Sequence, residues 1–421
     1  MNYLRVFLPS SADYKSARTS WRKDLLAGIT VGIVALPLAL AFGITTGAGA
    51  AAGLVTAILA GLLAAIFGGS NFQVSGPTGA MTVVLVPIVT KYGVEVLIPL
   101  GFLAGLLTLL LGILRAGSII NRVPWPVMEG FTLGIALVIA LQQAPTAFAT
   151  PSIDGGRTVV TAWNTINGAI DNGLNFSAIL IVLLTLFIKF TYPKLVHRFK
   201  IKIHIPASFL AIVISSIVVL ALDIDIPKVG DLPKAIFHLN KIELFGLGAY
   251  ELISAVIAIA LLASIESLLS ARVADQLAHI HDDEHKYQPN RELFGQGLAS
   301  MFSSLVGGMP ATGAIARTSV NIRAGAISRL AAIFHAVFLL SVVLFLSPII
   351  SSIPTSALAG VLIGTSYRMA SPGNLRELLR TTRLDSSILI FTAAVVVFVD
   401  LIWGIALGTA LYFLLKKLKR K

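Results

Sequence analysis

The sequence of 421 residues contains no cysteine and few charged residues. The absence of cysteine excludes disulfide bonds, thiolate metal ligands and a cysteine nucleophile. Charged residues make up 12% of the chain and hydrophobic residues 56%, whereas soluble domains average about 25% charged residues. This composition excludes a water-soluble enzyme, because too few polar side chains are present to cover its surface. It also excludes a disordered chain, because such chains are poor in hydrophobic residues.

Long hydrophobic stretches are the main feature that the sequence does contain. A bilayer core about 30 Å thick requires about 20 apolar residues per helix. Two sets of seven apolar stretches lie near residues 25–47, 50–68, 78–90, 94–114, 125–148, 175–192 and 205–222, and near 250–271, 292–307, 313–322, 328–350, 354–367, 385–401 and 403–415. The sequence therefore predicts an all-α polytopic membrane protein with fourteen transmembrane segments. The third and tenth segments are half-spans, too short to cross the bilayer alone.

Basic residues outnumber acidic ones by 32 to 20, giving a net charge of +12. They concentrate in loops that follow an even number of spans, and five of the last six residues are basic. Basic residues mark the cytoplasmic side of a membrane protein. We therefore expect both termini to be cytoplasmic, in a multi-pass protein of the cell (inner) membrane. The positive charge then orients the helices and does not indicate a nucleic-acid partner.

The expected organisation has three parts. Residues 1–24 form a cytoplasmic N-terminal segment without the apolar core of a signal peptide, residues 25–415 form the transmembrane transport domain, and residues 416–421 form a basic cytoplasmic end. No phosphate-binding loop, dinucleotide fingerprint or hydrolase elbow occurs, so we expect neither enzyme activity nor a cofactor. The histidine-rich and acidic run at 279–285 has no helical ligand spacing, which favours a solvated loop over a metal site.

An internal repeat links the two short spans. The first contains Gly76-Pro77-Thr78-Gly79-Ala80 and the second Pro310-Ala311-Thr312-Gly313-Ala314, each preceded by a Gly-Gly pair. The Thr-Gly-Ala triplets are 234 residues apart (312 − 78). Because each half has an odd number of spans, the halves must be inverted relative to each other, as in many secondary transporters.

Proline and glycine in these phrases favour an extended entry into each short helix. Two helix N-termini would then direct unpaired N–H groups, from Thr78, Gly79, Ala80, Gly313 and Ala314, toward one anion. The alternative is that each phrase only kinks a packed helix.

Two charged residues, Glu266 and Arg317, lie within apolar stretches, where a charge is costly. Glu266 is deep in the eighth span, with Ser270 one helical turn later on the same face. We expect this pair to couple transport to a proton, the alternative being a structural carboxylate held by hydroxyls or an arginine. Arg317 follows Gly313 by one turn and offers a planar fork of donors to an oxyanion, the alternative being a place at the cytoplasmic interface.

These phrases resemble the sulfate permease (SulP) family, relatives of the prestin and pendrin anion transporters. The resemblance rests on residues 73–80, on Glu266, and on the stretch from Asn290 to Thr318. It implies a core domain of spans 1–4 and 8–11 and a gate domain of spans 5–7 and 12–14. It also implies substrate held between the N-termini of spans 3 and 10, elevator-like alternating access and a homodimer.

Three departures from the family pattern bear on the domain content, the substrate and the coupling ion that we expect. The family usually carries a cytoplasmic STAS domain after the last span, whereas this sequence ends at Lys421, so that either the chain is cut there or the domain is naturally absent. Pro37-Leu38-Ala39 replaces the Pro-Gln-Gly of many sulfate-transporting members. Ile315 and Arg317 stand where the sodium-dependent bicarbonate branch has Thr and Gly, and a fixed positive charge there disfavours a second cation.

The sequence therefore predicts secondary active transport of a small anion (bicarbonate, a dicarboxylate or sulfate), with proton symport or anion exchange favoured over sodium symport. The partners expected are the anion, a proton, membrane lipid and a second copy of the chain, without a metal. Two alternatives stay open: a nucleobase–proton symporter of the same fold, against which Arg317 argues, and an anion channel.

Overall fold

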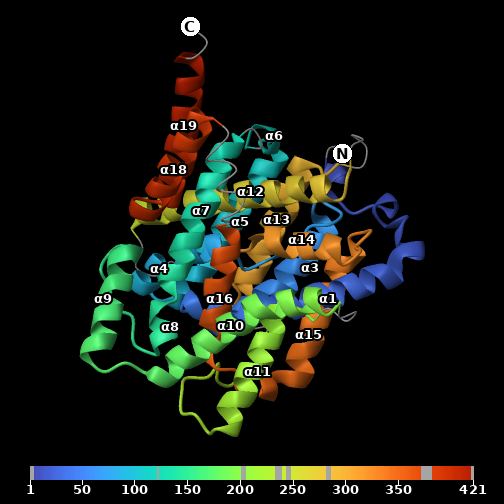
Figure 1. Cartoon of the computed structure of the whole chain (residues 1–421). Helices are drawn as coiled ribbons and strands as arrows, with labels where there is room; N and C mark the ends of the chain where they lie inside the picture. The colour runs from blue at the N-terminus through green and yellow to red at the C-terminus, as the bar shows by residue number, and fades with distance from the viewer. Residues whose placement is uncertain are drawn as a thin grey trace. The chain divides into compact units, whose positions relative to one another are not determined.

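The computed structural model is built of helices joined mostly by short connections (Figure 1). It describes residues 4–120, 123–200, 205–232, 239–242, 248–280, 286–370 and 382–418. Each of the fourteen apolar stretches contains helix, as the sequence predicts. Among the described residues, eight helices are long and apolar enough to cross a membrane. Part of the expected basic end, residues 419–421, and most of the histidine-rich run, residues 281–285, lie outside the described residues.

The chain divides into two compact units. Unit 1 comprises Met1–Asn121 and Val229–Ser352, and unit 2 comprises Arg122–Lys228 and Ile353–Lys421. The elements of unit 1 are η1 (Leu4–Phe7), η2 (Ser11–Tyr14), α1 (Ala17–Thr45), α2 (Gly49–Val55), η3 (Thr56–Ala60), α3 (Gly61–Phe67), β1 (Ser75–Gly76), α4 (Gly79–Tyr92), η4 (Val94–Val96), α5 (Leu97–Ile113), α6 (Gly117–Ile120), α12 (Ala249–Leu277), α13 (Pro289–Leu305), β2 (Thr312–Gly313), α14 (Ile315–Arg323) and α15 (Leu330–Ser351).

The regular elements of unit 2 in its described part are all helices, and one isolated antiparallel bridge pairs Lys228 with Pro354. Its elements are α7 (Trp125–Gln142), α8 (Ala144–Phe148), α9 (Thr158–Asp171), α10 (Phe176–Arg198), α11 (Ala207–Ala221), α16 (Thr355–Met369), α18 (Arg383–Phe398) and α19 (Leu401–Leu418). Its core includes Ala178, Ile181 and Val219, which pack together with Ala357. Proline precedes the first helical residue of α7, α11 and α16, where its missing N–H costs no helical hydrogen bond.

Glycine allows the helices of unit 1 to pack closely. A Cβ atom on Gly105 of α5 would lie 2.8 Å from the carbonyl oxygen of Gly297 on α13, and a Cβ on Gly297 would lie 2.6 Å from the carbonyl of Gly105. Real Cβ atoms do not approach so closely, so the two backbones meet only because both residues lack a side chain. Small residues at such crossings are typical of membrane helices, which gain their stability from packing.

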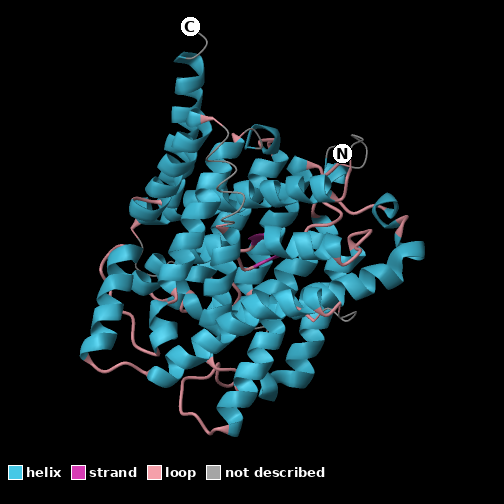
Figure 2. Ribbon diagram, in the orientation of Figure 1, coloured by secondary structure: helices cyan, strands magenta, loops and turns pink. Residues whose placement is uncertain are grey.

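A two-stranded antiparallel ladder lies within unit 1, drawn in magenta in Figure 2. It pairs Ser75 with Gly313 and Gly76 with Thr312. The other regular elements of the described residues are helices, as the sequence predicts, and this two-residue ladder forms because the Pro- and Gly-containing phrases leave the chain extended before each short helix. The paired residues come from opposite halves of the sequence, so the ladder joins the two repeats directly.

The two helices that follow the ladder are short, as the sequence predicts. Helix α4 has 14 residues and α14 has nine, so α14 spans only about 13 Å at 1.5 Å per residue. Thr78 caps α4 and accepts a hydrogen bond from the N–H of Met81 at 3.4 Å. In the second repeat the cap is Ala314, two residues beyond the equivalent threonine.

The N-terminal segment, residues 4–14, is held on unit 1 by one carboxylate. Asp13 accepts two hydrogen bonds of 2.8 Å from Arg291 of α13 and one of 3.1 Å from Arg329, which precedes α15. Burial acts to raise the pKa of Asp13, but the bonds from Arg291 and the Ser10 N–H, with the charge of Arg329, hold that pKa well below its usual range. Phe7 adds a ring contact with Phe294 at 5.0 Å.

Candidate functional site

The ladder presents two faces, and its pairing decides which side chains share each face. Neighbouring residues of a strand point to opposite sides, and directly paired residues point to the same side. Gly76 and Thr312 therefore share the first face, while Ser75 and Gly313 share the second. The chemistry of the site divides between these two faces.

Glu266 lies on the first face and joins the two repeats. Its Oε2 accepts a hydrogen bond of 2.7 Å from Thr312 and one of 2.8 Å from Thr78. The two hydroxyl oxygens are 3.0 Å apart. Threonines at the same place in the two repeats thus converge on one carboxylate oxygen of α12, and Glu266 itself remains partly exposed. Both of these hydrogen bonds fall on the same carboxylate oxygen.

Arg317 lies inside unit 1, although its sequence position also allows a place at the membrane surface. Its side chain is 1% exposed, and its Nη2 donates to the carbonyl of Pro77. Its Nη1 has no hydrogen-bond partner among the described residues. A Cβ atom on Gly76 would contact that nitrogen, so glycine makes room for the guanidinium. The structure thus buries Arg317 within unit 1 and leaves one of its donors without an acceptor among the described residues.

The N-terminus of α4 begins directly after Thr78, so Gly79 and Ala80 contribute its first backbone N–H groups. The N–H groups of Gly79 and Ala80 belong to the first turn, where a helix has no internal acceptors. Both residues are buried. Thr78, which caps this helix, also bonds Glu266, so the helix end and the carboxylate are positioned together.

The N-terminus of α14 differs from the expectation. The N–H of Gly313 donates to Ser267 Oγ at 3.0 Å, and that of Ala314 donates to the Val74 carbonyl at 2.9 Å. These two amides, expected to face an anion, are therefore occupied. The physical reason is that the ladder extends through Gly313, which delays the helix start. The first-turn N–H groups of α14 belong to residues 315–317.

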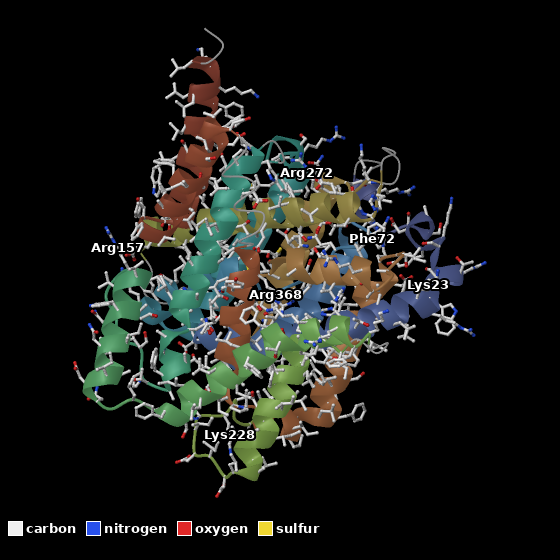
Figure 3. All side chains as sticks on the ribbon, viewed as in Figure 1. Lys23, Phe72, Arg157, Lys228, Arg272 and Arg368 are labelled. Atoms are coloured by element: carbon white, nitrogen blue, oxygen red, sulfur yellow. The ribbon has the colours of Figure 1, made fainter. Side chains whose placement is uncertain are left out.

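Ser270 contacts α14 and has no bond to Glu266. Its hydroxyl lies 3.2 Å from that of Thr318, which also accepts the Val74 N–H at 3.1 Å. Ser270 therefore ties α12 to the segment that leads into the ladder. Phe72, labelled in Figure 3, belongs to the same segment, and its carbonyl accepts from Asn321 Nδ2 at 2.8 Å.

On the second face, Ser75 is connected through Gln296 to another buried carboxylate, that of Glu292. Gln296 Nε2 donates to Ser75 Oγ at 2.5 Å and to Glu292 Oε1 at 2.9 Å. The other oxygen of Glu292 accepts the N–H groups of Gly69 and Ser70 at 2.9 and 3.0 Å. In the sequence, Glu292 stands out only as part of the motif from Asn290 to Thr318. A carboxylate within the ninth apolar stretch is the signal that could have singled it out.

Lys189 of α10 is a second buried charged residue that is not predicted from the sequence. Its side chain is 1% exposed, and its Nζ donates to the Val361 carbonyl at 2.6 Å and to the Thr365 hydroxyl at 2.7 Å. Lys189 makes no ion pair within the described part of unit 2. Arg368, labelled in Figure 3, is close enough to repel it. A lone lysine inside an apolar run was the available signal.

Metal-binding clusters are absent from the described residues. No group of three or more His, Asp or Glu side chains lies close enough there to hold an ion. Most of the histidine-rich run at 279–285 lies outside those residues, so its expected role as a solvated loop stays a prediction.

Comparison with known proteins places this geometry in a family. Residues 21–392 match the sulfate permease family. The putative sulfate transporter YvdB of Bacillus subtilis is 36% identical over 93% of this chain and 73% of its own length. The bicarbonate transporter BicA of Synechocystis sp. is 30% identical over 91% of this chain and 68% of its own length.

Solved structures agree with the sequence matches. The transmembrane domain of a cyanobacterial bicarbonate transporter BicA superimposes with a TM-score of 0.82 at 28% identity, covering 92% of this chain and 97% of that one. Murine Slc26a9, in the inward-facing state, gives a TM-score of 0.85 at 18% identity over 100% of this chain and 72% of that one, which shows a shared fold. The chain is thus a multi-pass membrane protein and belongs to the sulfate permease family of anion transporters, not to any class of enzyme.

Proposed function

We propose that this protein carries out secondary active transport of a small oxyanion, with bicarbonate and sulfate as the first candidates and dicarboxylates as the next. The observation that carries the proposal is the buried guanidinium of Arg317, whose Nη1 lacks a partner among the described residues. A buried donor without an acceptor is costly, and an oxyanion would satisfy it. The names of the relatives, a putative sulfate transporter and a bicarbonate transporter, support the same substrate class.

The anion would be held by backbone as well as by side chain. The first-turn N–H groups of α4, at Gly79 and Ala80, and those of α14 each carry part of a helix dipole's positive charge. Thr78 adds a hydroxyl. Gly313 and Ala314 would form the wall of this site, because their N–H groups are already bonded.

Glu266 is the residue we propose for coupling. Its carboxylate bonds a threonine from each repeat, so adding or removing a proton would change the contact between the two repeats. Ser270 would support this role by tying α12 to α14. The positive charge of Arg317 acts on the same carboxylate and disfavours a sodium ion beside it. Proton symport or anion exchange is therefore preferred to sodium symport.

The architecture proposed is fourteen transmembrane segments in a seven-plus-seven inverted repeat. Antiparallel pairing of β1 with β2 supports it, because equivalent phrases of inverted halves run in opposite directions where they meet. The helices of unit 1 would act as the core of an elevator-like transporter and those of unit 2 as its gate. A homodimer in the cell (inner) membrane with both termini in the cytoplasm completes the proposal.

Uptake into proteoliposomes tests the function. A panel of labelled bicarbonate, sulfate, fumarate and chloride, with and without sodium and with an imposed pH gradient, identifies the anion and the coupling ion. Competition by uracil would instead indicate a nucleobase carrier. A flux above about 10⁵ ions per second would indicate a channel, because domain movements take microseconds to milliseconds.

The variant Glu266→Gln tests the coupling role. It keeps acceptor capacity for the threonines but cannot ionise, so we expect uptake to become independent of the pH gradient. The matched control is Glu251→Gln, on the same helix in an exposed ion pair with Lys91. Unchanged pH dependence in Glu266→Gln would exclude Glu266 as the coupling residue.

A further inference from the structure

Unit 1 contains a buried carboxylate that the proposed transport cycle does not use. Glu292, near the start of α13, is 1% exposed. Every hydrogen bond the structure gives it comes from a donor: the Gly69 and Ser70 N–H groups on Oε2 and the Gln296 amide on Oε1. A carboxyl group surrounded by donors is one that holds its negative charge, because a protonated oxygen would need an acceptor.

The charge on Glu292 determines how the Gln296 side chain is oriented. Gln296 uses Nε2 for both of its bonds, to Glu292 and to Ser75. Turning the amide over would bring its oxygen against the carboxylate and replace a charge-assisted hydrogen bond with a repulsive contact. While Glu292 is ionised, the amide therefore has one orientation.

That orientation determines the direction of a hydrogen bond in the ladder. Because Gln296 donates to Ser75 Oγ, the Ser75 hydroxyl is the acceptor there and directs its own proton elsewhere. If residue 292 were neutral and able to donate, the amide could turn over, and the Ser75 hydroxyl would then donate to it. Ser75 is paired with Gly313, directly before the cap of α14.

We propose that Glu292 is a positioning residue for the anion site, acting through Gln296 on the polarity of the Ser75 hydroxyl and so on the strand that leads into α14. This inference rests on the proposed function, because it assumes that the N-terminus of α14 binds the anion. Glu292 itself contacts no residue of that site. Its influence passes along one chain of hydrogen bonds, from carboxylate to amide to hydroxyl.

Four variants test the proposal. Glu292→Gln reverses the direction of the hydrogen bond to Gln296 while keeping the shape of the side chain. Ser75→Ala removes the hydroxyl at the end of this chain of hydrogen bonds, and the double variant combines the two changes. Gln296→Leu breaks the link while leaving the bonds from Glu292 to Gly69 and Ser70. Each variant is reconstituted into proteoliposomes, and KM and Vmax are measured with the labelled anion that the wild type transports. Glu95→Gln, at an exposed site, is the matched control.

We expect each single variant to raise KM about three- to tenfold, the equivalent of one altered hydrogen bond, with Vmax nearly unchanged. The double variant should be no worse than Ser75→Ala alone, because both changes act on one chain. Effects that add in the double variant would overturn the proposal, as would a loss of thermal stability without a change in KM.

A second readout separates this inference from the function on which it rests. Hydrogen exchange of peptides covering residues 73–80 and 311–318 needs no transport. If the wild type takes up no anion, the proposed function fails, and this exchange still tests whether Glu292 positions the strand that leads into α14. We expect faster exchange in both segments for Glu292→Gln and no further change when Ser75→Ala is added. Exchange equal to that of the wild type would refute the positioning role.

Discussion

Replacing Asp13 with alanine should release the N-terminal segment, and the structure fixes the size of the effect. Arg291 would lose both of its bonds to the carboxylate, while its Nε already lacks a partner among the described residues. Arg329 would lose one bond but keep others to backbone carbonyls and Asn71. The arginine side chains are 7% and 2% exposed.

Removing one partner of such a buried pair costs about 3 kcal/mol, since an unpaired charge is left behind. At about 1.4 kcal/mol per factor of ten, local opening of residues 4–14 should become about 150-fold more frequent. Hydrogen exchange of peptides from this segment, at pH 7 in detergent, measures the change. Combining Asp13→Ala with Arg291→Met should cost less than Asp13→Ala alone, because Arg291 no longer leaves an unpaired charge and Arg329 keeps its bonds to backbone carbonyls and Asn71.

The pH dependence of this contact has a definite sign. The pKa of Asp13 is depressed in the folded protein. The stabilisation is therefore fully present above the unfolded pKa of about 4, and it is lost as the pH falls through the lower folded value. Exchange of the segment, corrected for intrinsic rates, should be flat between pH 8 and 5. A threefold or smaller effect of Asp13→Ala at pH 7, or marked loosening between pH 8 and 5, would refute the reasoning.

Two further predictions concern buried positions. Gly313→Ala would drive a Cβ into the Gln73 amide, so we expect about 1–3 kcal/mol of destabilisation and loss of uptake, whereas Gly248→Ala, with its nearest atom at 3.8 Å, should resemble the wild type in thermal unfolding. Lys189→Ala should destabilise the protein by about 2–4 kcal/mol through the cavity it leaves, while Lys189→Met, which fills the space without a charge, should be nearly neutral. Equal losses for the two lysine variants would contradict this.

Much of the fold was predictable because hydropathy is a local property. Each apolar stretch contains a helix, and the Pro- and Gly-containing phrases correctly mark the short helices α4 and α14. The family resemblance, based on the same phrases and on Glu266, is confirmed by the match over residues 21–392. What could not be predicted is where each short helix begins, because the ladder captures Gly313 and shifts the start of α14 by two residues relative to the repeat.

The sequence by itself determined that this chain is a membrane protein with an internal repeat, and it indicated Thr78, Glu266 and Arg317. Composition and spacing suffice for that, since a bilayer accepts only long apolar helices and tolerates buried charge only where it has a use. Only the tertiary structure decided which groups meet. The contact between Thr78 and Glu266 joins residues 188 positions apart. It forms because an antiparallel ladder between the two halves brings their equivalent phrases together, a pairing that depends on three-dimensional packing and that no local pattern specifies.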